Sequence, residues 1–178
     1  IYVLLITMHH MISDGWSIDI LYKELTALYN AYVEGRDSPL EELPIQYLDY
    51  ALWQRTWLSG EVLHKQLEYW KNHLADAPEI LSFPTDKPRP KILTYEGDSY
   101  SEAIPLDLLK KLRTFSQSQG VTLFMVLLTA FKLLLHRYSG ERNIVVGTPI
   151  ANRRQKELEG SIGFYVNSLA LNTDCGDN

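Results

Sequence analysis

The fold and chemistry of this chain depend most on one stretch, Met8-His9-His10-Met11-Ile12-Ser13-Asp14-Gly15-Trp16-Ser17. It follows the continuous apolar run 1–8, which is typical of a strand buried on both faces. It precedes residues 16–33, where apolar side chains recur at steps of three and four, as in an amphipathic helix. The stretch is therefore expected to join a strand to a helix, where side chains and backbone N–H groups reach a cleft.

His10 is the candidate catalytic residue of this stretch. A histidine at a strand end can present one ring nitrogen to a reacting group when its other nitrogen is held. Its ordinary pKa suits proton transfer near neutral pH. Because neighbouring residues of a strand point to opposite faces, His9 is expected to pack and His10 to face the cleft.

The remaining residues of the stretch are expected to support the catalytic loop. Asp14 is predicted to cap the helix or to pair with an arginine, rather than to partner His10. Gly15 lets a backbone N–H approach a developing oxyanion, at the positive end of the helix dipole. No metal site is expected, because adjacent histidines point apart. A purely structural loop is the alternative, but the whole pattern at this junction favours chemistry.

Composition indicates a globular protein without an affinity for nucleic acid. Hydrophobic residues make up 46% of the 178 residues, the net charge is −5, and no basic run is present. The single cysteine, Cys175, excludes an internal disulfide and fits a reducing compartment, so a cytoplasmic location is expected. The longest apolar stretch, 123–135, contains Lys132 and is too short to cross a bilayer, so no membrane partner is expected.

Alternating strand and helix patterns predict a layered α/β fold. Residues 75–95 hold four of the eight prolines and are expected to form a stiff crossover between two lobes. Residues 1–74 would then end an N-terminal lobe, and residues 96–178 would form part of a C-terminal lobe. The other expected elements are helices after Pro44, near 63–74, at 105–118 and, apolar nearly all round and hence buried, at 123–138, with strands at 97–104, 143–148 and 163–172.

Several side chains outside the stretch have default structural interpretations. Tyr47, Tyr50 and Trp53 lie at helical spacing and are expected in a core. The arginines that flank the expected strand ends are expected to be solvated; they are Arg142, Arg153 and Arg154. Asn167 lies in an apolar strand, where its amide is either buried with partners or lines a tunnel.

Three ordered segments resemble signature motifs of nonribosomal peptide synthetase condensation domains. Residues 9–15 resemble the HHxxxDG motif, residues 47–54 the YxDYAxWQ motif, and residues 162–171 the IGFFVNTLxLR motif. Their order and spacing agree with the family over essentially the whole chain. Asn172 stands where that family usually has arginine, which removes an ionic role at this position; Ser168 and Tyr165 are milder departures from threonine and phenylalanine.

The resemblance implies a two-lobed α/β sandwich like that of chloramphenicol acetyltransferase, with a tunnel between the lobes. This chain would be incomplete at both ends, and the arginine that pairs with the motif aspartate would lie before Ile1. The fragment alone is therefore expected to be inactive.

The resemblance also implies an amide-forming acyltransferase. An amine on a downstream carrier would attack an acyl or peptidyl thioester on an upstream carrier, and His10 would orient the amine and accept its proton. Trp16, Ser17 and Asn167 are candidate tunnel or substrate contacts. The domain itself would bind no cofactor, because substrates arrive on the 4'-phosphopantetheine arms of peptidyl carrier domains, next to an adenylation domain in the same or a partner chain.

Three other functions remain as alternatives. A coenzyme A-dependent acyltransferase of the same superfamily is less favoured, because residues 47–54 and 162–171 resemble the synthetase branch. An epimerisation domain is less favoured, because Trp16-Ser17 resembles the condensing branch that joins two L-residues. A non-catalytic docking module is disfavoured by the intact His10 and Asp14.

Overall fold

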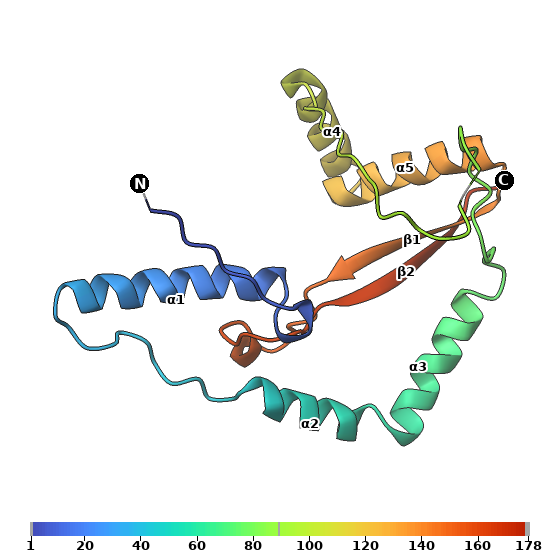
Figure 1. Ribbon diagram of the computed structural model, residues 1–178. Coiled ribbons are helices and arrows are strands. Elements are labelled where there is room, and N and C mark those ends of the chain that lie inside the picture. The colour runs from blue at the N-terminus through green and yellow to red at the C-terminus, as the bar shows by residue number, and fades with distance from the viewer. Residues whose placement is uncertain (1, 89, 177–178) are drawn as a thin grey trace. The chain divides into compact units, whose positions relative to one another are not determined.

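The computed structural model describes residues 2–88 and 90–176. Its elements, in chain order, are η1 (His10–Ile12), α1 (Gly15–Val33), α2 (Tyr47–Trp57), α3 (Gly60–His73), α4 (Leu106–Ser118), α5 (Leu123–Ser139), β1 (Asn143–Ile150), η2 (Lys156–Leu158) and β2 (Asn167–Asp174) (Figure 1). The mixture of helices with a small sheet agrees with the predicted α/β class.

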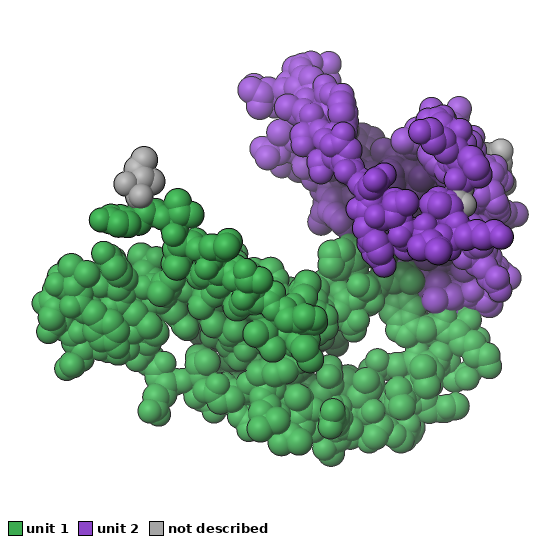
Figure 2. Space-filling view, viewed as in Figure 1, with its two compact units in different colours: residues 1–72, 147–170 green, residues 73–146, 171–178 purple. Residues whose placement is uncertain are grey.

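The chain divides into two compact units (Figure 2). Unit 1 comprises Ile1–Asn72 and Gly147–Ala170, and unit 2 comprises His73–Val146 and Leu171–Asn178. Residues 74–105, apart from Arg89, contain no helix or strand. The crossover expected at 75–95 stays a prediction. The assignment of 1–74 and 96–178 to the lobes of a complete domain stays a prediction.

The ends of α1 and the start of α2 lie at residues that commonly cap or terminate helices. Asp14 is the N-cap of α1, where its side chain accepts a hydrogen bond from the N–H of Ser17. Gly35 follows the end of α1 with φ of 70°, a left-handed conformation that glycine adopts without strain. A capping box formed by Gln46 and Asp49 starts α2.

A small aromatic core holds unit 1 together. Tyr50, Leu158 and Tyr165 are buried, and Ile45 and Tyr47 pack against them. Tyr50 and Tyr47 therefore occupy the predicted core. Trp53 differs, because it is 44% exposed and stacks on Trp57, with 5.4 Å between the ring centroids.

In unit 2, α4 and α5 contact each other, but the predicted burial of α5 is wrong. Thr122 caps α5, yet large apolar residues such as Phe124 and Leu134 are half exposed. The buried residue of this helix is Lys132, whose ammonium group donates to the carbonyl of Leu171 at 2.8 Å and to Thr173 Oγ1 at 2.5 Å. One face of α5 is thus attached to β2 by polar contacts, and the helix also contacts α4 and, through the ring of Tyr138, Phe83 at 5.6 Å between centroids.

β1 and β2 form a two-stranded sheet. The N–H of Cys175 donates to the carbonyl of Arg142, which joins the start of β1 to the end of β2, so the strands run antiparallel. β1 confirms the strand predicted at 143–148. β2 begins only at Asn167, later than the predicted 163–172, because the preceding N–H groups bond to a side chain of unit 1.

Two predicted strands are absent from the described chain. Residues 2–8 have no strand partner, and their apolar side chains are exposed, with Leu5 at 86%. Residue 1 lies outside the described residues. Residues 97–104 are likewise irregular and exposed. Both runs have strand-like composition, but a strand requires a hydrogen-bonded neighbour, and the described segments provide none.

Within the described residues, no single helix combines the length and apolar character needed to cross a membrane. Only α4 and α5 taken together, bent by 105°, meet that test of length and composition.

Candidate active site

The two histidines of residues 8–17 have different positions. His9 is the N-cap of η1, and its Nδ1 accepts a hydrogen bond from the N–H of Met11 at 3.1 Å. The side chain of His9 is exposed, so it caps a turn instead of packing as predicted. The reason is that this segment is a 3₁₀ turn, not a strand with alternating faces.

His10 has one ring nitrogen held and the other free to react. Its Nδ1 lies 2.7 Å from the carbonyl oxygen of Ser13. Because a carbonyl oxygen only accepts, Nδ1 carries the proton, and in the neutral ring Nε2 then has a lone pair that can accept a proton. The imidazole also meets the ring of Phe164 edge to face, with 5.3 Å between centroids and an interplanar angle of 84°.

His10 lines an open hollow of about 360 Å³ in unit 1. The rest of the lining consists of the start of α1 and apolar side chains: Ile6, Met8, Ser13, Asp14, Gly15, Ile18, Leu21 and Tyr22. A Cβ built on Gly15 would meet no atom within 4 Å, so space is open beside this backbone. His10, a potential base, and the accessible first turn of α1 therefore line the same hollow.

That first turn offers hydrogen-bond donors. Gly15 and Trp16 are the first two residues of α1, whose N–H groups have no partner within the helix. In residues 2–88 and 90–176 no other group accepts from them. Together with the positive end of the helix dipole, these N–H groups provide a place for a developing negative charge.

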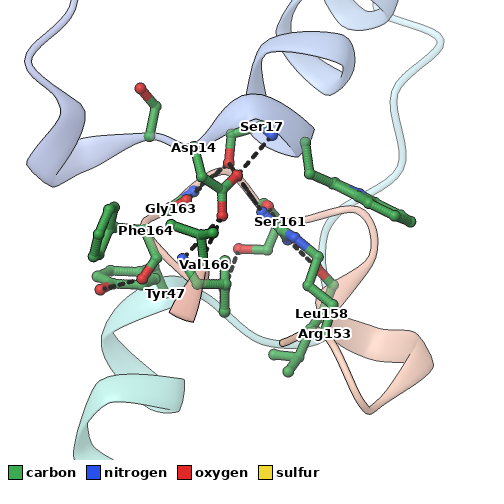
Figure 3. A network of polar contacts seen from close by, with 12 residues as sticks. Asp14, Ser17, Tyr47, Arg153, Leu158, Ser161, Gly163, Phe164 and Val166 are labelled. Atoms are coloured by element: carbon green, nitrogen blue, oxygen red, sulfur yellow. Dashed lines mark hydrogen bonds and ion pairs between the residues drawn. The ribbon is translucent and has the colours of Figure 1, made fainter. Parts of the chain in front are cut away.

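Asp14 is bonded to Ser17 and to residues far along the chain (Figure 3). Its Oδ1 accepts from the N–H of Ser17 at 2.9 Å, from the hydroxyl of Ser17 at 2.7 Å and from the guanidinium of Arg153 at 3.2 Å. Its Oδ2 accepts from the N–H groups of Tyr165 and Val166 at 3.0 and 3.2 Å. The carboxylate is thus a structural cap and an ion-pair partner, as predicted, and it joins residues 8–17 to residues 163–166.

The partner of Asp14 corrects two expectations. Arg153 was expected to be solvated, but its side chain is 1% exposed and forms the ion pair with Asp14. Its guanidinium also donates to the carbonyls of Leu158 and Ser161 and lies 4.0 Å above the Tyr165 ring centroid. The described chain therefore contains an arginine partner for Asp14, whereas the resemblance placed one before Ile1.

The other two arginines need no such correction. Arg142 is exposed and forms a bidentate pair with Asp174, at 2.7 Å for both contacts. Arg154 is exposed and makes no ion pair in the part of the chain that the structure describes. Nothing in the Arg153-Arg154 dipeptide alone distinguishes the buried arginine from its neighbour.

Ser17 is a second centre of this network. The side chain is fully buried, and its hydroxyl lies 2.8 Å from the carbonyl of Gly163, 3.1 Å from the N–H of Gly163 and 2.9 Å from the Arg153 guanidinium. These contacts give Ser17 a structural role. Because its side chain has no exposed surface, the structure does not support the predicted contact with a substrate.

The other two candidate substrate contacts lie at the surface. Trp16 is 45% exposed, and its indole N–H donates to the carbonyl of Glu159 at 3.0 Å. Asn167 is exposed, and its Oδ1 accepts from the N–H of Ser168, so the buried-amide interpretation does not hold. Contact of Trp16 or Asn167 with a substrate stays a prediction.

Asn172, which replaces the usual arginine of the third motif, lies in unit 2. Its amide nitrogen donates to the carbonyl of His73 at 2.9 Å. Its Oδ1 is buried and has no partner among the described residues. The position thus connects β2 to the end of α3 by a neutral hydrogen bond.

The electrostatics of Asp14 predict acid sensitivity. Burial by itself raises the pKa of this carboxyl, but the hydroxyl and N–H of Ser17, the N–H of Tyr165 and the charge of Arg153 together lower it from 3.8 to about 2. A depressed pKa stabilises the folded state above pH 4, and this contribution, about 2 kcal/mol, is lost as the pH falls from about 4 to 2.

The prediction can be tested by urea unfolding of the complete domain between pH 5 and pH 2.5. The difference in unfolding free energy between wild type and Asp14→Asn should shrink as the pH falls. A difference that stays constant over this range would contradict the assigned pKa.

Gly163 makes a close approach that a larger residue would prevent. A Cβ at this position would lie 2.3 Å from Cδ2 and 2.7 Å from Cγ of Tyr47. Gly163→Ala is therefore expected to destabilise the domain by about 1–3 kcal/mol, as overpacking of a fitted site does. Gly147→Ala is the matched control, because a Cβ there meets no atom within 4 Å. Equal melting temperatures for the two variants would contradict the prediction.

Comparisons with known proteins agree with this geometry. The family model described as "Condensation domain" matches residues 1–178. A linear gramicidin synthase of Brevibacillus parabrevis is 50% identical over 97% of this chain, which spans 2% of that synthase. Malpinin synthetase of Mortierella alpina is also 50% identical over 97% of the chain and 2% of its own length. The matched regions are thus small parts of these synthetases.

Solved structures show the same fold. An X-domain from teicoplanin biosynthesis is 26% identical, with a TM-score of 0.84 over 93% of this chain and 38% of that chain. A four-domain nonribosomal peptide synthetase bound to AMP and glycine is 31% identical, with a TM-score of 0.79 over 94% of this chain and 12% of that chain. These likenesses agree with the chloramphenicol acetyltransferase-like fold that the motifs implied, of which this chain is a part. The chain belongs to the condensation domain family.

Proposed function

We propose that this segment carries the catalytic loop of an amide-forming condensation domain in nonribosomal peptide synthesis. The observation that carries the proposal is the state of His10. Its Nδ1 is held by the carbonyl of Ser13, and its Nε2 is free at an open hollow beside the first turn of α1. Membership in the condensation domain family supports the reaction class.

In the proposed reaction the acceptor amine attacks the carbonyl carbon of the donor thioester. A C–N bond forms, and the carbonyl oxygen becomes an oxyanion that the N–H groups of Gly15 and Trp16 stabilise. His10 Nε2 accepts the proton of the amine. The intermediate then collapses, the C–S bond breaks, and the imidazolium returns its proton to the leaving thiolate.

Positioning contributes more than base strength to this step. An α-amine has a pKa of about 7.7–8.0, so a substantial neutral fraction exists before any base acts. Holding the amine in line with the carbonyl can remove several kcal/mol of the barrier. A ring whose Nδ1 donates to the Ser13 carbonyl suits this role, because Nε2 is then the nitrogen that can accept the proton.

The substrates and partners belong to the same proposal. Donor and acceptor would arrive as thioesters on the 4'-phosphopantetheine arms of upstream and downstream peptidyl carrier domains, beside an adenylation domain. The size of the related synthetases, of which the chain spans 2–16%, supports a multidomain setting. The chain spans 38% of the solved X-domain, which supports inactivity of these 178 residues alone. A cytoplasmic location stays a prediction.

The test is a single-turnover assay with the complete protein that contains this segment. The upstream carrier is loaded with an acyl thioester and the downstream carrier with an aminoacyl thioester, and mass spectrometry follows the carrier-bound products. Amide product on the downstream carrier is expected. Equal rates with a coenzyme A thioester as donor would favour the acyltransferase alternative, and deuterium exchange at the donor Cα without amide formation would favour epimerisation.

A docking module is the second candidate, because one similar structure is a complex of the X-domain and OxyB from teicoplanin biosynthesis. That complex shares 27% identity and a TM-score of 0.84 with this chain. In the same assay a docking module would form no amide product with either donor.

A further inference from the structure

The start of α2 contacts the loop that carries Phe164. Tyr47 is the first residue of α2, and its hydroxyl donates to the carbonyl of Phe164 at 3.0 Å (Figure 3). The hydrogen bond spans 117 residues of sequence and connects the second signature motif to the third. Neither the condensation chemistry nor the aromatic core requires this hydroxyl.

The ring of Tyr47 fits closely against the backbone on either side of Phe164. Gly163 approaches so near that a Cβ would lie 2.3 Å from Tyr47 Cδ2. Tyr165 meets the same ring edge to face, with 5.2 Å between centroids and an angle of 87°. Residues 163–165 therefore pack closely against the Tyr47 ring, and the Tyr47 hydroxyl holds the carbonyl of Phe164.

Phe164 connects Tyr47 to His10, the proposed base, because its carbonyl bonds to Tyr47 and its ring contacts His10. The flanking residues are held on their own, since Gly163 bonds to Ser17 and the N–H of Tyr165 bonds to Asp14. The carbonyl of Phe164 is held by Tyr47. The ring planes of Phe164 and His10 meet at 84°. Among the described residues, the imidazole makes one hydrogen bond, from Nδ1 to the carbonyl of Ser13.

One hydrogen bond leaves the imidazole free to swing about the Nδ1–oxygen axis. The edge-to-face contact with Phe164 restricts that swing, so the direction of Nε2 depends on where Phe164 lies. We propose that Tyr47 is a positioning residue for the condensation step, which acts through the Phe164 carbonyl and ring to aim His10 Nε2. This inference rests on the proposed function, in which His10 is the base.

The test compares Tyr47→Phe with wild type in the complete protein, using the single-turnover assay with loaded carriers. The substitution keeps the ring against Gly163 and removes only the hydroxyl. We expect the limiting rate to fall about tenfold, because small misplacements of reacting groups cost one to two orders of magnitude. The acceptor concentration that gives half the limiting rate should change less than twofold, and the melting temperature should stay nearly constant.

Tyr50→Phe is the matched control. Tyr50 lies on the same helix and in the same core, and its hydroxyl accepts from Gln54 and Asn152 instead of contacting residue 164. We expect this variant to lower the melting temperature and to change the rate less than twofold. Equal rate losses in the two variants would overturn the inference, because they would indicate general loosening of the core.

A mutant cycle tests the path through Phe164. Phe164→Leu removes the contact with His10, so adding Tyr47→Phe to it should lower the rate no further. Additive losses would overturn the inference. A rate within twofold of wild type for Tyr47→Phe, with an inactive His10→Ala, would refute this inference alone. An active His10→Ala would instead refute the proposed function.

Discussion

His10→Ala, introduced into the complete domain, is expected to lower the rate of amide formation by about 10²–10⁴-fold, the contribution typical of a positioned general base. The fold should survive this change. The His10 side chain is exposed, makes one hydrogen bond to the carbonyl of Ser13, and contacts Phe164 only at a ring edge. Removing it costs one hydrogen bond and, because the side chain is exposed, leaves no buried cavity.

His9→Ala provides the comparison for this prediction. His9 caps η1 through the N–H of Met11, so its loss should lower the melting temperature slightly and the rate less than tenfold. Both variants are measured by single-turnover amide formation with loaded carriers and by thermal unfolding. Near-wild-type product from His10→Ala would remove His10 from the mechanism.

Arg153→Met should have the largest effect on stability. The variant leaves the carboxylate of Asp14 buried without its cation, removes the donor of the Ser161 carbonyl, and leaves the Leu158 carbonyl with only the N–H of Ser161. Breaking a buried ion pair by removing one partner typically costs about 3–5 kcal/mol. Because the pair holds residues 8–17 against residues 163–166, the rate of amide formation should fall with stability.

Two further variants test whether the loss of stability comes from the ion pair and its geometry. Arg153→Lys should not restore stability, because an ammonium group cannot bond to Asp14 and two carbonyls in the planar arrangement of a guanidinium. The double variant Asp14→Asn with Arg153→Met should be more stable than the sum of the single losses predicts, since no charge is left unpaired. Urea unfolding measures all three, and a loss below 1 kcal/mol for Arg153→Met would show that the ion pair is dispensable.

Asp14→Ala should lower both the melting temperature and the rate of amide formation, because it leaves the buried Arg153 without its anion. The carboxylate accepts five hydrogen bonds within the described residues, and none of them comes from His10. If melting were unchanged while the rate collapsed, Asp14 would have a chemical role that this geometry does not indicate.

Local signals allowed the helices and the catalytic loop to be predicted. Caps and breakers act within a few residues, so Asp14, Gly35 and Thr122 mark helix boundaries that the sequence alone indicates. The hydrogen bond of His10 is local as well, because the carbonyl that its Nδ1 contacts lies only three residues away.

Features that depend on distant residues could not be predicted in the same way. Arg153 is 139 residues from Asp14, and its burial depends on that contact, which no pattern near Arg153 indicates. Residues 2–8 have the composition of a buried strand, but strand formation depends on a neighbour that local composition does not specify. The contact between Tyr47 and Phe164 also joins segments 117 residues apart, so neither segment by itself indicates it.

The contacts of Asp14 also constrain the order of events during synthesis of the chain. Its Oδ2 is bound by an N–H that lies 152 residues later, at Val166. At about 5–20 residues per second, translation takes roughly 8–30 s to cover that distance. Helices α1 to α5 all precede Val166 in the chain, so the loop that carries His10 is synthesised long before the segment that secures it. The hydrogen bonds that secure this loop therefore form only late in synthesis, and a chain that ends before Val166 lacks this N–H donor to Asp14.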